Sequence, residues 1–185
     1  EMVNKHKPSS AISTARVNFL AHLLDNAAEQ NLGFEDGKFP PEKTIYLTLL
    51  QNTGIHKRIG REYLMDTPTE ESFLPLWNTC EAFLDSTKEK PRKLGELIKI
   101  LRSRPFKLKQ GVIDLWLPAF LIIKKNDYSL YNDAGIYIHT ITREVLDIMQ
   151  KSPAGFSVKA FNVEGVKLDL FSKYREALGI IQDAE

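Results

Sequence analysis

Two pairs of neighbouring acids are the first residues whose type and spacing could support chemistry. Glu35 with Asp36, and Glu70 with Glu71, could act as general acid and base or could bind a metal ion. The first pair falls in a predicted turn, and the second falls in the first turn of a predicted helix, where acids stabilise the helix dipole. The chain has no G-x-x-x-x-G-K-[ST] loop for nucleotide phosphates and no G-x-S-x-G or S-x-x-K serine motif. We therefore expect no enzyme activity within this chain and no bound cofactor.

The four histidines and the single cysteine do not form a metal-binding pattern. His6, His22, His56 and His139 are far apart in the sequence, and none belongs to an H-E-x-x-H motif, so we expect no metal site. Cys80 lies on the apolar stripe of a predicted helix, which favours a buried structural thiol over a nucleophile. A single cysteine cannot form a disulfide within the chain and is typical of a reducing compartment, so we expect a cytoplasmic protein.

The sequence predicts no membrane segment. The longest apolar run covers residues 112–123 and contains Asp114 and Pro118. A membrane-spanning helix needs about 20 predominantly apolar residues, more than this run provides. The chain opens with Glu1 and without the basic-then-apolar pattern of a signal peptide. We expect it to be a piece of a longer polypeptide.

Two clusters of basic residues could contact phosphate groups. Such contacts hold a protein on nucleic acid without reading its sequence. The alternative is an ordinary solvated surface, which the near balance of 25 basic and 24 acidic residues favours. The first cluster surrounds a glycine and comprises Lys57, Arg58 and Arg61, and the second leads into a long apolar segment and comprises Arg102, Arg104, Lys107 and Lys109.

Aromatic residues near a predicted hairpin form another candidate binding surface. Tyr128, Tyr131 and Tyr137 could stack nucleic-acid bases, and cross-strand packing within the hairpin explains them at least as well. His139 could also stack or bind, but it ends a predicted strand, where a structural role is favoured. Asp133 at the predicted hairpin tip would repel phosphates.

The first half of the chain predicts helices. Residues 10–33 and 41–54 carry apolar side chains at helical spacing. Residues 55–66 are mixed and basic and predict no regular element. Thr67, with Glu70 three residues later, predicts the N-cap of a third helix. The polar residues 86–92 then predict a linker, which would divide the chain into a helical subdomain, residues 1–90, and a second subdomain, residues 91–185.

The second half predicts a winged-helix-like module. Its long helix is apolar on nearly every side, which predicts a buried helix that is unsuited to reading bases in a major groove. The fold class we expect is therefore mainly α, with a helical N-terminal part followed by a winged-helix-like module that has a small β-hairpin or three-stranded sheet. The predicted elements are helices at 94–101 and 110–125, a hairpin of 128–131 with 136–138, a helix capped by Thr142, a strand at 156–161 and a last helix at 166–179.

Two stretches resemble a known family. The segment 2–56 contains V-N-K-x-K-P-S-S-A, A-R-x-x-F-L-A, L-G-F-E-D-G-x-F-P-P-E-K-x-I-Y and T-G-I-H. The segment 106–156 contains F-K-L-K-Q-G-V-I-D-L-W-L-P-A-F-L, S-L-Y-N-D-A-G-I-Y-I, T-R-E-V-L and S-P-A-G-F. Together they are similar to the region that follows the nucleotide-binding module in very large bacterial ATP-binding proteins of phage-defence and restriction-like loci, relatives of BREX-type ATPases. In that family a proline usually follows the hairpin, where this chain has His139.

The resemblance implies an accessory region of a DNA-directed ATPase machine, with the ATPase motifs outside this chain. Our first hypothesis is a non-catalytic interaction module that packs against the ATPase domain of the same chain or against a partner protein. The alternative is direct binding of nucleic acid by the cluster at 102–109, with Lys57 and Arg58 as further contacts. A third hypothesis, an isolated hydrolase or nuclease, has no supporting motif.

Overall fold

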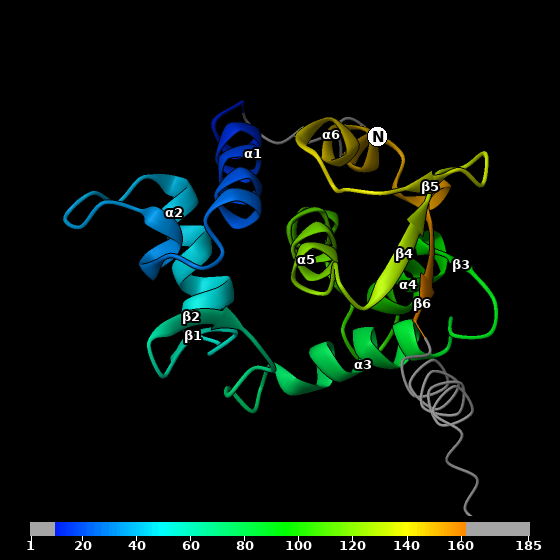
Figure 1. Ribbon diagram of the computed structural model, residues 1–185, viewed down its shortest axis with the longest axis horizontal. Coiled ribbons are helices and arrows are strands. Elements are labelled where there is room, and N and C mark those ends of the chain that lie inside the picture. Colours follow the sequence, from blue (N-terminus) through cyan, green and yellow to red (C-terminus); the bar gives the residue numbers. More distant parts are fainter. Residues whose placement is uncertain (1–9, 162–185) are drawn as a thin grey trace, which may run out of the picture.

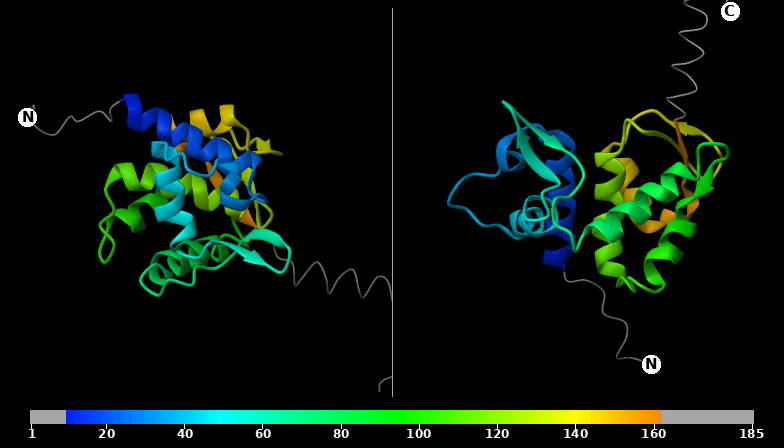
Figure 2. Two further views of the ribbon diagram at one scale, coloured as in Figure 1. Left: turned by 90° about the vertical axis from the view of Figure 1, so that its left-hand side faces the viewer. Right: turned by 90° about the horizontal axis from the view of Figure 1, so that it is seen from below.

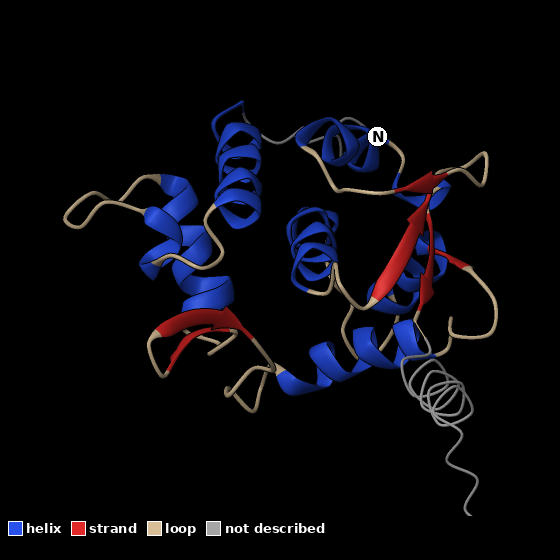
Figure 3. Ribbon diagram, in the orientation of Figure 1, coloured by secondary structure: helices blue, strands red, loops and turns tan. Residues whose placement is uncertain are grey.

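The computed structural model describes residues 10–161, and this part of the chain is mainly α, as expected, with two small antiparallel sheets where the sequence predicted one (Figure 1; Figure 3). The predicted last helix, 166–179, lies outside the described residues. With η for short helical turns that are not α, the elements are α1 (Ser10–Asp25), η1 (Gln30–Gly33), α2 (Pro41–Tyr46), η2 (Leu47–Gln51), β1 (His56–Ile59), β2 (Glu62–Met65), α3 (Leu74–Asp85), β3 (Arg92–Lys93), α4 (Leu94–Arg102), α5 (Gln110–Ile123), β4 (Tyr128–Tyr131), β5 (Tyr137–Ile138), α6 (Arg143–Lys151), η3 (Pro153–Gly155) and β6 (Ser157–Ala160).

Helix α5 forms the centre of the molecule. Helices α1 and α6 pack against it, the Trp77 ring of α3 meets its Phe120 ring edge-to-face at 5.6 Å, and Tyr128 of β4 donates a hydrogen bond to its Leu121 carbonyl (Figure 1). A helix that is apolar on all sides must be covered on all sides. The predicted long buried helix is therefore confirmed. Its buried residues are Ile113, Trp116, Leu117, Pro118, Ala119, Phe120, Leu121 and Ile122.

The larger sheet has four strands in the order β3-β6-β4-β5, and every neighbouring pair is antiparallel. Its inner face is apolar because alternate residues of the two central strands, Tyr128, Leu130, Val158 and Ala160, are buried. The predicted hairpin (β4 with β5) and the predicted third strand (β6) are confirmed. The sequence did not predict β3, a two-residue edge strand that makes the sheet four-stranded.

A second hairpin, β1 with β2, occupies the segment for which the sequence predicted no regular element. Ile59 pairs with Glu62 across a two-residue turn, and Gly60 in this turn has φ 65°, a conformation that favours glycine. Most of its side chains are exposed or half-buried, so the alternation of apolar residues that signals a strand is weak. Figure 2 shows this hairpin grouped with α1 and α2, on one side of the remaining elements.

The predicted start of the third helix at Thr67 is wrong. Helix α3 begins at Leu74, and Pro75 occupies its first turn, where a missing N–H costs nothing. The N–H groups of Thr69 and Glu70 donate instead to the carbonyl of Thr53, at 2.9 and 3.2 Å. The segment between β2 and α3 is thus bonded to the preceding loop and is not part of a helix.

The segment 86–92 is bonded to the larger sheet. The Thr87 side chain is fully buried, and its hydroxyl accepts a 2.8 Å hydrogen bond from the N–H of Ala160 in β6. Arg92, at the end of this segment, pairs with Val158 of the same strand. The residues that join α3 to β3 are therefore bonded to the sheet and do not form an open linker. The division into subdomains 1–90 and 91–185 stays a prediction.

Candidate nucleic-acid interface

The α4–α5 connection, with the last residue of α4, is an ordered loop that carries four of the predicted site residues; we call Arg102, Arg104, Lys107 and Lys109 the basic loop. The loop is closed by two backbone hydrogen bonds, from Lys107 N–H to the Ser103 carbonyl at 2.8 Å and from Leu108 N–H to the Leu101 carbonyl at 2.9 Å. Phe106 and Leu108 pack against the core, whereas all four basic side chains are exposed. The structure therefore exposes all four on one ordered loop.

The basic loop is not neutralised by acids among residues 10–161. The Arg102 guanidinium donates to the Gln110 side-chain oxygen, and Arg104, Lys107 and Lys109 have no ion-pair partner in this part of the chain. Gln110 in turn donates to Asp114 of α5. The Asp114 carboxylate also forms a 3.3 Å ion pair with Arg16 of α1. The acid of this network is thus matched by a cation from another helix.

A groove between α4 and η3 extends the basic surface. It has a volume of about 520 Å³, and Lys93, Lys99 and Arg102 are among its lining residues. Glu96 also lines it, but Arg92 binds the Glu96 carboxylate through two nitrogens, at 3.0 and 2.7 Å. The hydrogen bond from Arg92 lowers the pKa of Glu96, so this acid stays ionised and paired. The sequence did not predict the two lysines of this groove.

The acid at the tip of the β4–β5 hairpin is also paired. Asp133 makes a 2.7 Å ion pair with Lys93 of β3, forty residues away in the sequence. The hydrogen bond from Lys93 is the main reason why the pKa of Asp133 is lowered. Repulsion of phosphates by this tip, which the sequence predicted, is therefore reduced by the neighbouring lysine.

The structure does not bring Lys57 and Arg58 to this surface. Both lie on β1, whereas the basic loop follows α4, and Figure 1 shows these two elements on different sides of α5. Lys57 forms a 3.0 Å ion pair with Asp66, and Arg58 donates to the Gly60 carbonyl of its own turn. As neighbours in a strand, their side chains point to opposite faces of the hairpin. The two clusters are thus separate.

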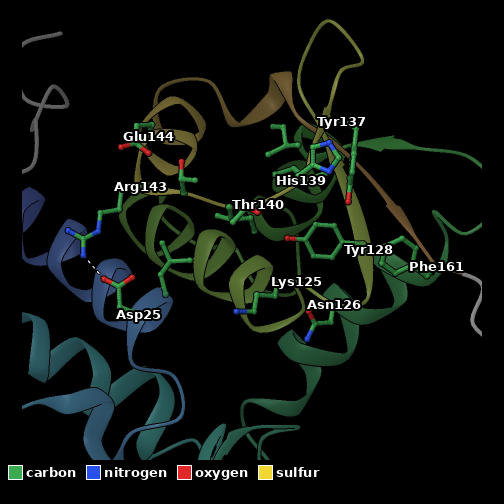
Figure 4. Close-up of a pocket in the computed structure, with 15 residues that line it drawn as sticks. Asp25, Lys125, Asn126, Tyr128, Tyr137, His139, Thr140, Arg143, Glu144 and Phe161 are labelled. Carbon is green, nitrogen blue, oxygen red and sulfur yellow. Dashed lines mark hydrogen bonds and ion pairs between the residues drawn. The ribbon is translucent and has the colours of Figure 1, made fainter.

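A second cavity lies elsewhere, beside the end of β5, and has a volume of about 780 Å³ (Figure 4). The sequence did not predict this cavity; we call it the β5 pocket. The tyrosines that the sequence predicted as a stacking surface differ in exposure. Tyr128 is buried on the inner face of the sheet, whereas Tyr137 is 43% exposed. Burial raises the pKa of Tyr128, and its hydroxyl donates to the Leu121 carbonyl at 2.7 Å. Tyr128 is therefore structural. The residues that line the pocket are Leu24, Asp25, Lys125, Asn126, Tyr128, Leu130, Tyr137, Ile138, His139, Thr140, Ile141, Thr142, Arg143, Glu144 and Phe161.

The remaining chemical candidates have structural partners. Cys80 is buried, it accepts a hydrogen bond from the Trp116 indole at 3.4 Å, and burial raises its pKa to about 12. His56 is buried beside Tyr46, whose hydroxyl lies 2.9 Å from its Nδ1. Among residues 10–161, no three His, Cys, Asp or Glu side chains gather as they would around a metal ion. No helix in the same range is long and apolar enough to cross a membrane.

No family model, curated protein or solved structure matches this chain.

Proposed function

We propose that this chain is a non-catalytic accessory module of a larger, DNA-directed ATP-binding protein in the cytoplasm, and that the module contacts the phosphate backbone of DNA through the basic loop. The observation that carries the DNA contact is the exposure of four cations on one ordered loop, with no acidic partner among residues 10–161. Phosphate contacts from Lys and Arg provide affinity and orientation without base recognition.

The chain order of α3 to β6 supports a winged-helix-like arrangement within this module. Helix α3, strand β3, helices α4 and α5, and strands β4 and β6 follow one another, and β6 lies between β3 and β4 in the sheet. In a winged helix the last strand likewise lies between the first two. The residues between β4 and β6, which hold β5 and α6, would then be an enlarged wing. The α4–loop–α5 unit would be its helix-turn-helix.

The covering of α5 favours contact with the backbone over recognition of bases. A recognition helix needs a free face that enters the major groove. On α5 only the first turn, Gln110, Gly111 and Val112, is exposed, and α1 packs along the helix with Arg16 bound to Asp114. A module of this kind would hold DNA of any sequence.

The test is fluorescence anisotropy of this chain with labelled duplexes of unrelated sequence at low salt. Reversing two unpaired cations of the loop, Arg104→Glu with Lys109→Glu, is expected to abolish binding to all duplexes. The matched control, Arg61→Glu with Lys90→Glu, makes the same change in net charge at exposed positions on other elements and is expected to keep most of the affinity. Equal loss in both double variants would contradict a role for the loop.

A second candidate function is packing against the ATPase domain of the same chain or against a partner protein. It is favoured by two exposed apolar side chains on one face of the β1–β2 hairpin, Ile59 at 46% and Leu64 at 42% exposure. The two side chains form a small patch. A hairpin face on which half of the side chains are apolar is suited to packing against another domain. Ile59→Ser with Leu64→Ser would weaken co-elution with the ATP-binding domain in size-exclusion chromatography and leave DNA binding unchanged.

A further inference from the structure

We infer that the β5 pocket is a nucleotide-binding site, which holds an aromatic base against its aromatic wall and a phosphate at Lys125. This inference does not rest on DNA binding by the basic loop, because the two surfaces share no residue. Its volume of about 780 Å³ falls within the range of small-molecule sites in proteins, about 300–1,000 Å³.

The aromatic wall is exposed and held in place. Tyr137 and Phe161 are 43% and 42% exposed, and the ring of Tyr137 meets that of His139 edge-to-face at 4.5 Å (Figure 4). Tyr131 supports Tyr137 across the hairpin, with ring centroids 5.9 Å apart. Exposed rings whose orientation is fixed by neighbours offer π-faces to a base at a small entropic cost.

Other lining residues provide polar groups that have no side-chain partner among the described residues. Lys125 and Asn126 follow the end of α5, and Thr140 follows β5; all three are exposed and have no side-chain partner among residues 10–161. Figure 4 shows the Thr140 side chain beside His139 and the Lys125 side chain at the end of α5, near Asn126. An ammonium group binds phosphate, and a carboxamide both donates to and accepts from the edge of a base.

The acids of the pocket are already used by other groups. Asp25 is paired with Arg143 across the α1–α6 gap. Glu144 has its pKa lowered mainly by a hydrogen bond from Thr142, which lies at the N-cap of α6. Among the described lining residues, Lys125 and Glu144 have no ion-pair partner, and the Glu144 carboxylate accepts a hydrogen bond from Thr142, so Lys125 is the cation available to an anionic group. This arrangement suits a ligand with one flat aromatic part and one anionic part.

The ligand could be a free mononucleotide or an unpaired nucleotide of a single strand, and two probes separate these sources. A labelled oligothymidylate is measured by anisotropy, and mant-labelled AMP by its fluorescence. Tyr137→Ala and His139→Ala are each expected to weaken binding about 5- to 100-fold, the range found when a stacking ring is truncated. Lys125→Gln is expected to reduce the slope of log K against log salt by about 0.7 for the oligonucleotide.

Matched controls change the same residue types outside the pocket. Phe39→Ala removes an aromatic ring that is 71% exposed in the other half of the chain, and Lys90→Gln removes an exposed cation. Both variants are expected to bind the two probes like the wild type. The basic-loop variant Arg104→Glu with Lys109→Glu is expected to bind mant-AMP like the wild type. Retained mant-AMP binding by this loop variant separates the pocket from the proposed DNA contact.

Binding of the oligonucleotide alone would identify a single strand as the ligand, and binding of mant-AMP as well would identify a mononucleotide site. The inference is overturned if neither probe binds the folded chain, or if the pocket variants bind like Phe39→Ala and Lys90→Gln. Circular dichroism verifies folding of each variant. If Tyr137→Ala fails to fold, His139→Ala and Lys125→Gln decide the question, because both side chains are exposed and Lys125 lies outside the sheet.

Discussion

Thr87→Val tests directly whether the segment after α3 is part of the packed structure. The hydroxyl of Thr87 donates to the Leu84 carbonyl at 2.7 Å and accepts from the N–H of Ala160 at 2.8 Å. Valine has nearly the same shape but can neither donate nor accept. The Leu84 carbonyl keeps a partner, since it also accepts from the backbone N–H of Thr87 at 2.8 Å. The substitution therefore leaves one buried group unsatisfied, the N–H of Ala160.

Leaving a buried backbone N–H without a partner costs about 1–3 kcal/mol of the free energy of unfolding. For a chain of this size, 1 kcal/mol lowers Tm by about 2–4 °C, so we expect a decrease of roughly 2–12 °C. Thr79→Val, on the preceding helix α3, is the matched control. The Thr79 hydroxyl only donates to the Pro75 carbonyl one turn earlier, so we expect a change below about 0.5 kcal/mol.

The assay is urea unfolding followed by circular dichroism, with the midpoint and the m-value compared among wild type, Thr87→Val and Thr79→Val. We expect a lower midpoint for Thr87→Val alone, with an unchanged m-value. If the two variants unfold alike, residues 86–92 are not held to β6 by this hydroxyl, and the packing of α3 with the sheet would have to be reconsidered.

Three further predictions concern buried or paired groups. Cys80, with a pKa raised to about 12 by burial, should not react with an aromatic disulfide reagent at pH 8 until the chain is unfolded; fast reaction of the folded chain would refute its burial. Burial lowers the pKa of His56 below its ordinary value of about 6.5, so stability should be highest above that pH, decrease as the pH falls from there towards the lowered pKa, and level off below it. Unfolding curves measured at several pH values should show this decrease in stability for the wild type and not for His56→Asn. The same decrease in both proteins would contradict the role of His56. Arg16→Met should cost about 1–2 kcal/mol, because its pair with Asp114 is mostly buried, while Arg143→Met breaks an exposed pair and should cost under about 0.5 kcal/mol in the same melts.

The elements with strong local signals could be predicted from the sequence. The continuous apolar run of α5 can only be a buried helix, and the turn Asn132 to Gly135 between alternating residues identified the β4–β5 hairpin. Thr142 caps α6 as predicted, and its hydroxyl accepts from the Val145 N–H. In each case the signal lies within the element itself.

The errors come from signals that depend on distant residues. Thr67 and Glu70 have the spacing of a capping box, but the N–H groups nearby are taken by Thr53, which no local pattern reveals. The β1–β2 hairpin buries few side chains, so its strands lack the expected alternation. The polar residues 86–92 have the composition of a linker, but Thr87 is bonded to Ala160 of β6, seventy-three residues away, and Arg92 pairs with Val158 of the same strand; the division of the chain near residue 90 stays a prediction.

The candidate sites likewise divide into residues that a local sequence pattern predicted and residues that only the fold brings together. The basic loop is contiguous in sequence and was predicted, whereas the groove beside it needs Lys93 and Lys99 to meet η3 from another segment. The β5 pocket is assembled from the ends of α1, α5, β5 and β6, so the pairing of its aromatic and polar walls follows only from the fold.

The slope of log K against log salt for a DNA duplex measures how many phosphates the basic loop contacts. Four phosphate contacts by the basic loop predict a slope of about −3.6, and the neutral variant Arg104→Gln with Lys109→Gln predicts about −1.8, with equal values on unrelated sequences. Identical slopes for wild type and variant, or no binding by the folded chain at low salt, would contradict the account and leave packing against another domain as the function to test.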